Sequence, residues 1–144
     1  DDWYSPKFIE TYLWLLSKFD AVGEGNNKYY NVAKGLYKEW NNVKHASLCS
    51  TVIKKNMLDV LDRSINSGEL FFDIAFWRIC KQEQKNAVII AELGLNVGMK
   101  GLPGRAGIGG GHRPDTEGFT RDKDGSVLKK WIGEDSKLYE NMKG

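Results

Sequence analysis

The stretch GLPGRAGIGGGHRPDTEGF, residues 101–119, divides this chain into two parts of different character. It overlaps a segment, residues 94–111, that holds eight glycines, and no acidic residue occurs between Glu92 and Asp115. Glycine loses much conformational entropy on ordering and brings no side chain to offset that loss. We therefore expect residues 94–144 to form a minor, flexible and irregular C-terminal region, with short helical turns in SVLKKWIG and EDSKLYENM.

Residues 1–93 carry apolar side chains at helical spacing in four consecutive runs. Ser5-Pro6 has the pattern of a helix N-cap followed by proline at the first helical position. Gly68 and Gly94 stand where helices commonly end. The sequence thus predicts an all-α protein: an up-down-up-down four-helix bundle followed by the glycine-rich C-terminal region. The expected helical runs cover residues 8–19, 29–43, 48–65 and 70–93.

The charge of the chain is nearly balanced, with 21 basic and 19 acidic residues among 144 and a net charge of +2. So small an excess does not indicate nucleic-acid binding. The best candidate for a membrane span, LFFDIAFWRIC at residues 70–80, is short and contains Asp73 and Arg78, which favours a buried helix. The aromatic side chains of the four runs are expected to fill the core, with a pigment or cofactor pocket as the lesser alternative; they include Trp14, Tyr37, Trp40, Phe72, Phe76 and Trp77.

The two cysteines, Cys49 and Cys80, are expected to be buried and not to form a disulfide. If they lie on antiparallel helices joined near Gly68, one stands 19 residues before the turn and the other 12 residues after it. The difference of seven residues corresponds to about 10 Å along the helix axis. A disulfide needs Cα atoms within about 7 Å.

The segment TRDKDGSV, residues 120–127, resembles part of a calcium-binding loop. Asp122 and Asp124 fall on ligand positions, but Thr120 and Trp131 stand where such loops place their strongest carboxylates. We therefore expect a turn centred on Asp124-Gly125 and no metal site.

The glycine-rich stretch also fails the requirements of a catalytic or nucleotide-binding loop. A phosphate loop needs a Lys-Ser or Lys-Thr pair at a fixed distance from its glycines, and that pair is missing. His112, Asp115 and Glu117 lie in an expected loop, whereas acid–base catalysis usually needs a positioned, desolvated group. We therefore expect no enzyme activity, no catalytic residue and no cofactor.

The predicted layout runs from SPKFIETYLWLLSKF through AVIIAELGL as a bundle (residues 1–93), with residues 94–144 as the minor region. It resembles the PsbQ-like extrinsic subunits of photosystem II, most closely the additional extrinsic subunit found in diatoms. The resemblance implies a non-catalytic protein of the plastid thylakoid lumen, peripheral to the membrane and not inserted. Such a protein docks on intrinsic and extrinsic photosystem II subunits, and it stabilises the oxygen-evolving complex and its retention of calcium and chloride.

Candidate partner contacts are cationic and aromatic side chains that would steer the protein to an acidic surface. They are Lys34, Lys38, Lys54, Lys55, Lys100, Arg105, Arg113 and Trp131. Two alternatives stay open. One is nucleic-acid binding, with Lys100, Arg105 and Arg113 on phosphates and the aromatic rings on bases. The other is a secreted helical protein-interaction module. The weak charge excess favours a protein partner, so no nucleic acid is expected.

Overall fold

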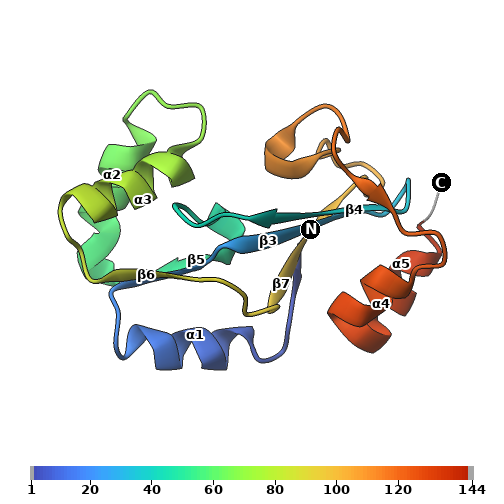
Figure 1. Ribbon diagram of the computed structural model, residues 1–144, viewed down its shortest axis with the longest axis horizontal. Coiled ribbons are helices and arrows are strands. Elements are labelled where there is room, and N and C mark those ends of the chain that lie inside the picture. Colours follow the sequence, from blue (N-terminus) through green and yellow to red (C-terminus); the bar gives the residue numbers. More distant parts are fainter. Residues whose placement is uncertain (1, 143–144) are drawn as a thin grey trace. The chain divides into compact units, whose positions relative to one another are not determined.

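The computed structural model describes residues 2–142, except for the side chain of His112, and it contains both helices and strands. One sheet has five strands and the other has three (Figure 1). The protein is therefore mixed α/β, and the prediction of an all-α four-helix bundle is wrong. No helix among the described residues is long and apolar enough to cross a membrane.

The chain forms two compact units from alternating pieces of sequence. The first, called here the five-stranded unit, combines residues 1–5, 28–40 and 94–144. The second, the three-stranded unit, combines residues 6–27 and 41–93. The chain thus passes between the units four times.

The three-stranded unit is built around β2, which pairs antiparallel with β5 and parallel with β6. Helix α1 lies on one face of this sheet, and helices α2 and α3 lie on the other (Figure 1). The strands are β2 (Ala21–Glu24), β5 (Thr51–Ile53) and β6 (Ala87–Ile90). The helices are α1 (Phe8–Leu16), α2 (Leu58–Ile65) and α3 (Phe72–Gln82), with 3-10 turns η1 (Leu48–Ser50) and η2 (Lys55–Met57). The buried core consists of Ala21, Ala46, Met57, Val60, Phe76, Trp77 and Cys80.

The five-stranded unit has the strand order β1-β7-β3-β4-β8. Strand β7 pairs antiparallel with β1, where Trp3 is opposite Val97, and parallel with β3. The strands are β1 (Trp3–Tyr4), β3 (Asn26–Asn31), β4 (Leu36–Asn41), β7 (Asn96–Lys100) and β8 (Thr120–Arg121). The remaining elements are η3 (Gly110–His112), α4 (Ser126–Ile132), η4 (Gly133–Ser136) and α5 (Lys137–Glu140). The buried core consists of Tyr30, Val32, Val97, Met99, Leu128 and Ile132.

The run expected to be helical over residues 29–43 forms strands β3 and β4 instead. All six residues of β3 are buried, so burial here does not follow a helical period. Tyr30 of β3 and Val32, just beyond the end of the strand, are fully buried in the same core. Aromatic and β-branched residues fit a pleated sheet well. Gly35, which a helix would only tolerate, adopts φ +60° between the two strands.

Two other expected helices are interrupted by strands. The run over 48–65 contains η1, β5 and η2 before α2 begins. The run over 70–93 contains α3 and, after a turn, β6. Thr51, Val52 and Ile53 are consecutive β-branched residues, which favour a strand. Gln84 adopts φ 49°, a left-handed conformation that cannot continue the helix, so α3 ends just before it. Only the first run keeps its type as α1, although α1 begins at Phe8 and not at the expected cap.

The cysteines do not lie on paired antiparallel helices, as the disulfide argument assumed. Cys49 is half-buried in η1, Cys80 is buried in α3, and each carries a thiol. Burial raises the pKa of the Cys80 thiol to about 11.

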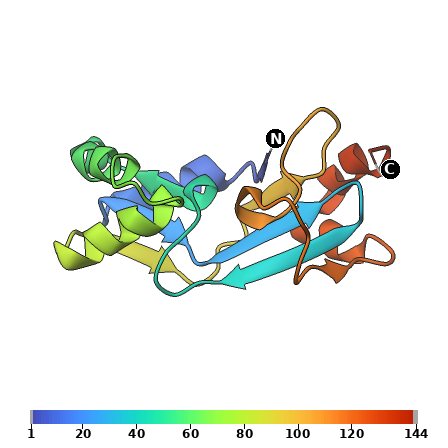
Figure 2. The same cartoon turned by 90° about the horizontal axis from the view of Figure 1, so that it is seen from above.

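The glycine-rich stretch lies across one face of the five-stranded sheet, and α4 lies on the other face (Figures 1 and 2). Two backbone hydrogen bonds close it into small loops, from Gly101 N to Gly107 O at 2.7 Å and from Gly109 N to Arg113 O at 3.0 Å. The Asn31 side-chain amide also donates to the Ile108 carbonyl at 2.9 Å. The short helical turns predicted after this stretch are confirmed as α4, η4 and α5.

Candidate functional site

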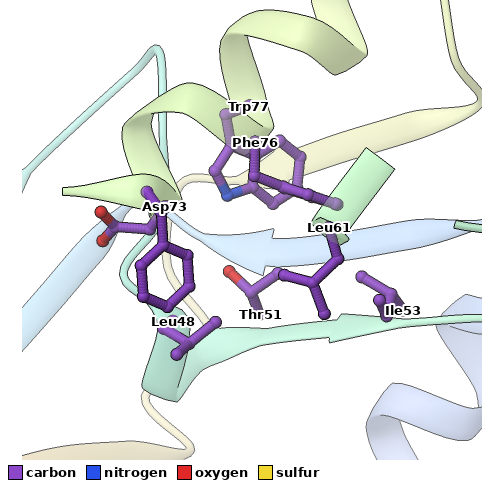
Figure 3. Close-up of a pocket in the computed structure, with 8 residues that line it drawn as sticks. Leu48, Thr51, Ile53, Leu61, Asp73, Phe76 and Trp77 are labelled. Carbon is purple, nitrogen blue, oxygen red and sulfur yellow. The ribbon is translucent and has the colours of Figure 1, made fainter. Parts of the chain in front are cut away.

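A pocket opens between β5 and the helices α2 and α3, entirely within the three-stranded unit (Figure 3). Its volume is about 120 Å³, and its walls are mainly apolar. The lining residues are Leu48, Thr51, Ile53, Leu61, Phe72, Asp73, Phe76 and Trp77.

Two regular repeats bring these side chains together. Thr51 and Ile53 lie two residues apart on β5, so both point to the same face of the sheet. Phe72, Phe76 and Trp77 recur at the spacing of one helix face on α3. The pocket is therefore the space left where a strand face meets a helix face.

The indole of Trp77 packs against β2 at Gly23 and against the ring of Phe76. A Cβ atom at Gly23 would lie 2.6 Å from Trp77 Cζ2 and 2.5 Å from the Ala46 Cβ, so only glycine allows the indole to approach β2 this closely. Phe76 packs against the indole edge to face, with ring centroids 5.5 Å apart. These contacts give the pocket a wall with one fixed orientation.

The polar groups of the pocket wall are few and differ in what they offer a ligand. The Thr51 hydroxyl donates to the Ser47 carbonyl at 2.9 Å, so its proton is already used. The Asp73 carboxylate accepts from the Ile74 amide at 2.9 Å. Trp77 is only 4% exposed, and among the described residues its Nε1 has no hydrogen-bond partner. Its N–H is therefore the one uncommitted side-chain donor of the eight lining residues.

Ion pairs link α2 and α3, the two helices that line the pocket. Arg63 on α2 donates to Glu83 just beyond α3 at 3.0 Å and to Asp59 at 3.1 Å. Hydrogen bonding to Arg63 lowers the pKa of the Glu83 carboxyl to about 2. Arg78 on α3 also pairs with Glu69 in the α2–α3 connection. The walls of the pocket therefore belong to a braced pair of helices.

Two of the predicted partner contacts lie together in the five-stranded unit. The Lys38 Nζ is 3.9 Å from the ring centroid of Trp40, and the Arg113 guanidinium carbon is 5.4 Å from the same centroid. Lys38 also donates to the Glu117 carbonyl at 3.4 Å. Gly110 lies against the indole, because a Cβ there would be 2.9 Å from Trp40 Nε1. These side chains fasten the glycine-rich stretch to β4.

Two further predicted contacts, Lys100 and Trp131, take part in packing. Lys100 is 9% exposed, and its Nζ lies 3.6 Å from an Asp2 carboxylate oxygen. Trp131 meets Tyr37 edge to face at 5.6 Å beside the buried core.

The remaining four predicted contacts are exposed or partly exposed. Lys54 and Lys55 belong to the three-stranded unit, and Lys54 pairs with Asp20 at 3.0 Å. This pairing lowers the pKa of the Asp20 carboxyl. Lys34 and Arg105 belong to the five-stranded unit. The structure therefore divides the predicted set between two units, and partner binding by these residues stays a prediction.

The two carboxylates that resembled calcium ligands hold the start of α4. Asp122 accepts from the Tyr30 hydroxyl at 3.0 Å and from the backbone amides of Val127 and Leu128 at 3.3 and 3.2 Å. Asp124 accepts from the Ser126 amide at 3.1 Å. Across residues 2–142, excluding the His112 side chain, no three His, Cys, Asp or Glu side chains are grouped as a metal site. The side chain of His112, named among the acid–base candidates, lies outside the described part of the chain.

A pocket beside the aromatic side chains was expected only as the lesser alternative to core packing. Phe76 and Trp77 were expected as core residues, and they are buried in the core as well as lining the cavity. Their spacing on α3 was a usable signal for a shared face. No pattern in the sequence announces that the Trp77 N–H lacks an acceptor, because that depends on residues distant along the chain.

Comparison of the chain with models of known protein families, with curated proteins and with solved structures finds no match. The structure by itself shows a mixed α/β protein with a small, mainly apolar pocket between a strand and two helices.

Proposed function

We propose that the protein is a non-catalytic binding module whose three-stranded unit receives a compact apolar group in this pocket. The observation that carries the proposal is a cavity of about 120 Å³ walled by apolar side chains from β5, α2 and α3. A cavity of about 150 Å³ with similar walls is large enough to bind benzene. The pocket is somewhat smaller and is partly open to solvent, so it suits a group no larger than a single six-membered ring or a short branched chain.

The setting of the pocket supports a role in binding. Small-molecule sites are concave, largely apolar and supplied with only a few polar groups, as this pocket is. Gly23 seats the Trp77 wall, and Arg63 ties α2 to the end of α3, so the pocket exists before any ligand arrives. A preformed site avoids part of the ordering cost of binding.

The expected affinity follows from the size of the ligand. A single aromatic ring buries about 200 Å². At about 25 cal/mol per Å², this burial contributes about 5 kcal/mol. Part of this gain is lost to the entropy of association, so we expect a Kd on the order of 1 mM.

A pair of matched substitutions tests the proposal. Leu48 lines the pocket and is 50% exposed, whereas Leu58 does not line it and is 51% exposed. In an NMR titration with benzene, we expect saturable shifts at the lining residues of the wild-type protein and of Leu58→Trp. Leu48→Trp fills the mouth of the pocket and should weaken binding at least tenfold. Shifts that do not saturate, or that are equal in the two variants, would refute the proposal.

Docking on photosystem II remains a separate prediction. It rested on a four-helix layout, and this chain is mixed α/β. The lumenal location rested on the same layout, and it and the alternative of nucleic-acid binding likewise remain predictions.

A further inference from the structure

We infer that the ligand of this pocket is neutral and carries a hydrogen-bond acceptor, such as a ketone or amide carbonyl on a compact ring, to which the Trp77 Nε1–H donates. The inference rests on the proposed binding function and adds the chemical class of the ligand. It also assigns Trp77 as the residue that determines specificity.

The unpaired indole N–H carries the argument. Trp77 is 96% buried, and its Nε1 has no partner among the described residues. A buried donor without an acceptor loses its bond to water and gains nothing in return. Most buried polar groups in proteins are paired, so an unpaired group in a pocket wall marks a position that a ligand atom can complete. Figure 3 shows the nitrogen on the edge of the indole that is turned toward Thr51.

The other polar groups of the wall restrict the ligand further. The Thr51 proton is committed to Ser47, so Thr51 cannot supply a competing donor. The Asp73 carboxylate also lines the pocket and accepts hydrogen bonds only, when ionised. Its negative charge repels an anionic ligand. The acceptor that meets Trp77 is therefore expected to be a neutral oxygen and not a carboxylate.

Access to the N–H requires a small movement of the wall. The Nε1 atom is buried, so an acceptor reaches it only after a neighbouring side chain turns aside. Leu48 is half exposed, whereas the other seven lining residues are buried or intermediate.

The experiment uses two probes of nearly the same shape, cyclohexanone and methylenecyclohexane. The ketone has an acceptor oxygen where the hydrocarbon has a methylene group. Both are titrated into the wild-type protein and into Trp77→Phe, which keeps an aromatic ring and removes the N–H. We expect the ratio of ketone affinity to hydrocarbon affinity to be about fivefold higher in the wild type, as for a typical buried hydrogen bond.

The indole signal of Trp77 gives a second and independent measurement. In a ¹H–¹⁵N spectrum of the wild-type protein, this signal should move downfield with cyclohexanone and stay in place with methylenecyclohexane. Trp77→Phe identifies the signal by its loss; if that variant does not fold, ¹⁵N-indole labelling with ring-to-backbone correlations identifies the signal in the wild type. In a third arm at low salt, cyclohexanecarboxylate should bind more weakly than the ketone, and Asp73→Asn should narrow this difference.

The outcomes separate the two proposals. If neither neutral probe binds the wild-type protein, the binding function itself fails. If both probes bind but the affinity ratio is the same in Trp77→Phe, or the Trp77 signal does not respond to the ketone, the binding function stands. The assignment of Trp77 as a donor to the ligand is then overturned.

Discussion

Asp122 is predicted to be the most important single carboxylate for the stability of the five-stranded unit. It is 7% exposed and accepts three hydrogen bonds, from the Tyr30 hydroxyl and from the Val127 and Leu128 amides. The first joins the helix start to β3 in the middle of the sheet, and the other two satisfy first-turn amides of α4. The substitution Asp122→Ala removes the two carboxylate oxygens, and with them all three hydrogen bonds.

The magnitude of the loss is the sum of two effects. Removing a side chain that caps helix amides costs about 1 kcal/mol. Leaving the buried Tyr30 hydroxyl without an acceptor costs about 2 kcal/mol more. The total of about 3 kcal/mol is a large share of the roughly 5–15 kcal/mol that stabilise a typical domain. For a chain of this size it corresponds to a fall in Tm of roughly 10 °C.

Urea unfolding followed by circular dichroism measures the effect, with Asp124→Ala as the matched control. Asp124 also accepts from a first-turn amide of α4, that of Ser126, but its side chain is exposed. Asp124→Ala should therefore unfold close to the wild-type midpoint. Adding Tyr30→Phe to Asp122→Ala should recover about 1 kcal/mol, because the unpaired hydroxyl is gone. Equal midpoints for Asp122→Ala and Asp124→Ala would refute this reasoning.

Three further predictions concern other parts of the molecule. Because Arg63 lowers the pKa of Glu83 from 4.5 to about 2, this pair stabilises the fold above about pH 4.5, and the contribution is lost as the pH falls toward 2. Arg63→Ala should flatten this acid limb in unfolding midpoints measured from pH 5 to pH 2. Because burial raises the pKa of Cys80 to about 11, iodoacetamide at pH 8 should leave Cys80 unmodified in the native protein and modify it in urea, as peptide mass spectrometry can show. Gly109→Ala should loosen the glycine-rich stretch in hydrogen–deuterium exchange, because its Cβ would lie 1.9 Å from a backbone carbonyl oxygen. Gly107→Ala, whose Cβ meets only a lysine side chain at 3.1 Å, should not.

Each of these has a distinct contrary result. An acid limb that is unchanged by Arg63→Ala would show that the Glu83 carboxylate gains nothing from the pair. Rapid alkylation of Cys80 without denaturant would show that α3 opens locally. Equal exchange in the two glycine variants would show that the stretch adapts around the added methyl group.

Local signals in the sequence identified some elements correctly. The apolar spacing after Phe8 needs no distant partner to be recognised as a helix, and α1 forms there. The short helical character of SVLKKWIG was also sufficient, since α4 and η4 occupy that segment. In both segments, local spacing and the final structure agree.

Strand pairing caused the main errors, because it depends on residues far away in the chain. Tyr29, Tyr30, Ala33 and Tyr37 satisfy a helical period, yet Tyr30 pairs with Met99 in β7 and its ring enters the sheet core. The hydrogen bonds and burial supplied by β7 outweigh the local preference. A single chain segment does not reveal which partner strand it will meet.

Only part of the candidate site could be predicted from the sequence. Phe76 and Trp77 were expected to fill the core, and both are buried there. That a cavity remains beside them depends on Gly23 and Thr51, which come from two other strands. The unpaired N–H of Trp77 depends on the same tertiary packing.

The pairing of β1 with β7 has a consequence for the time course of synthesis. Trp3 faces Val97, so the partner of the first strand is made only after some ninety further residues. At about 5–20 residues per second, translation leaves β1 without its partner for roughly 5–20 s. The three-stranded unit, whose last residue is Leu93, is complete before that moment. Folding during translation should therefore order the three-stranded unit first: once residue 93 has emerged from the ribosome, α3 should resist proteolysis while β1 is still cleavable.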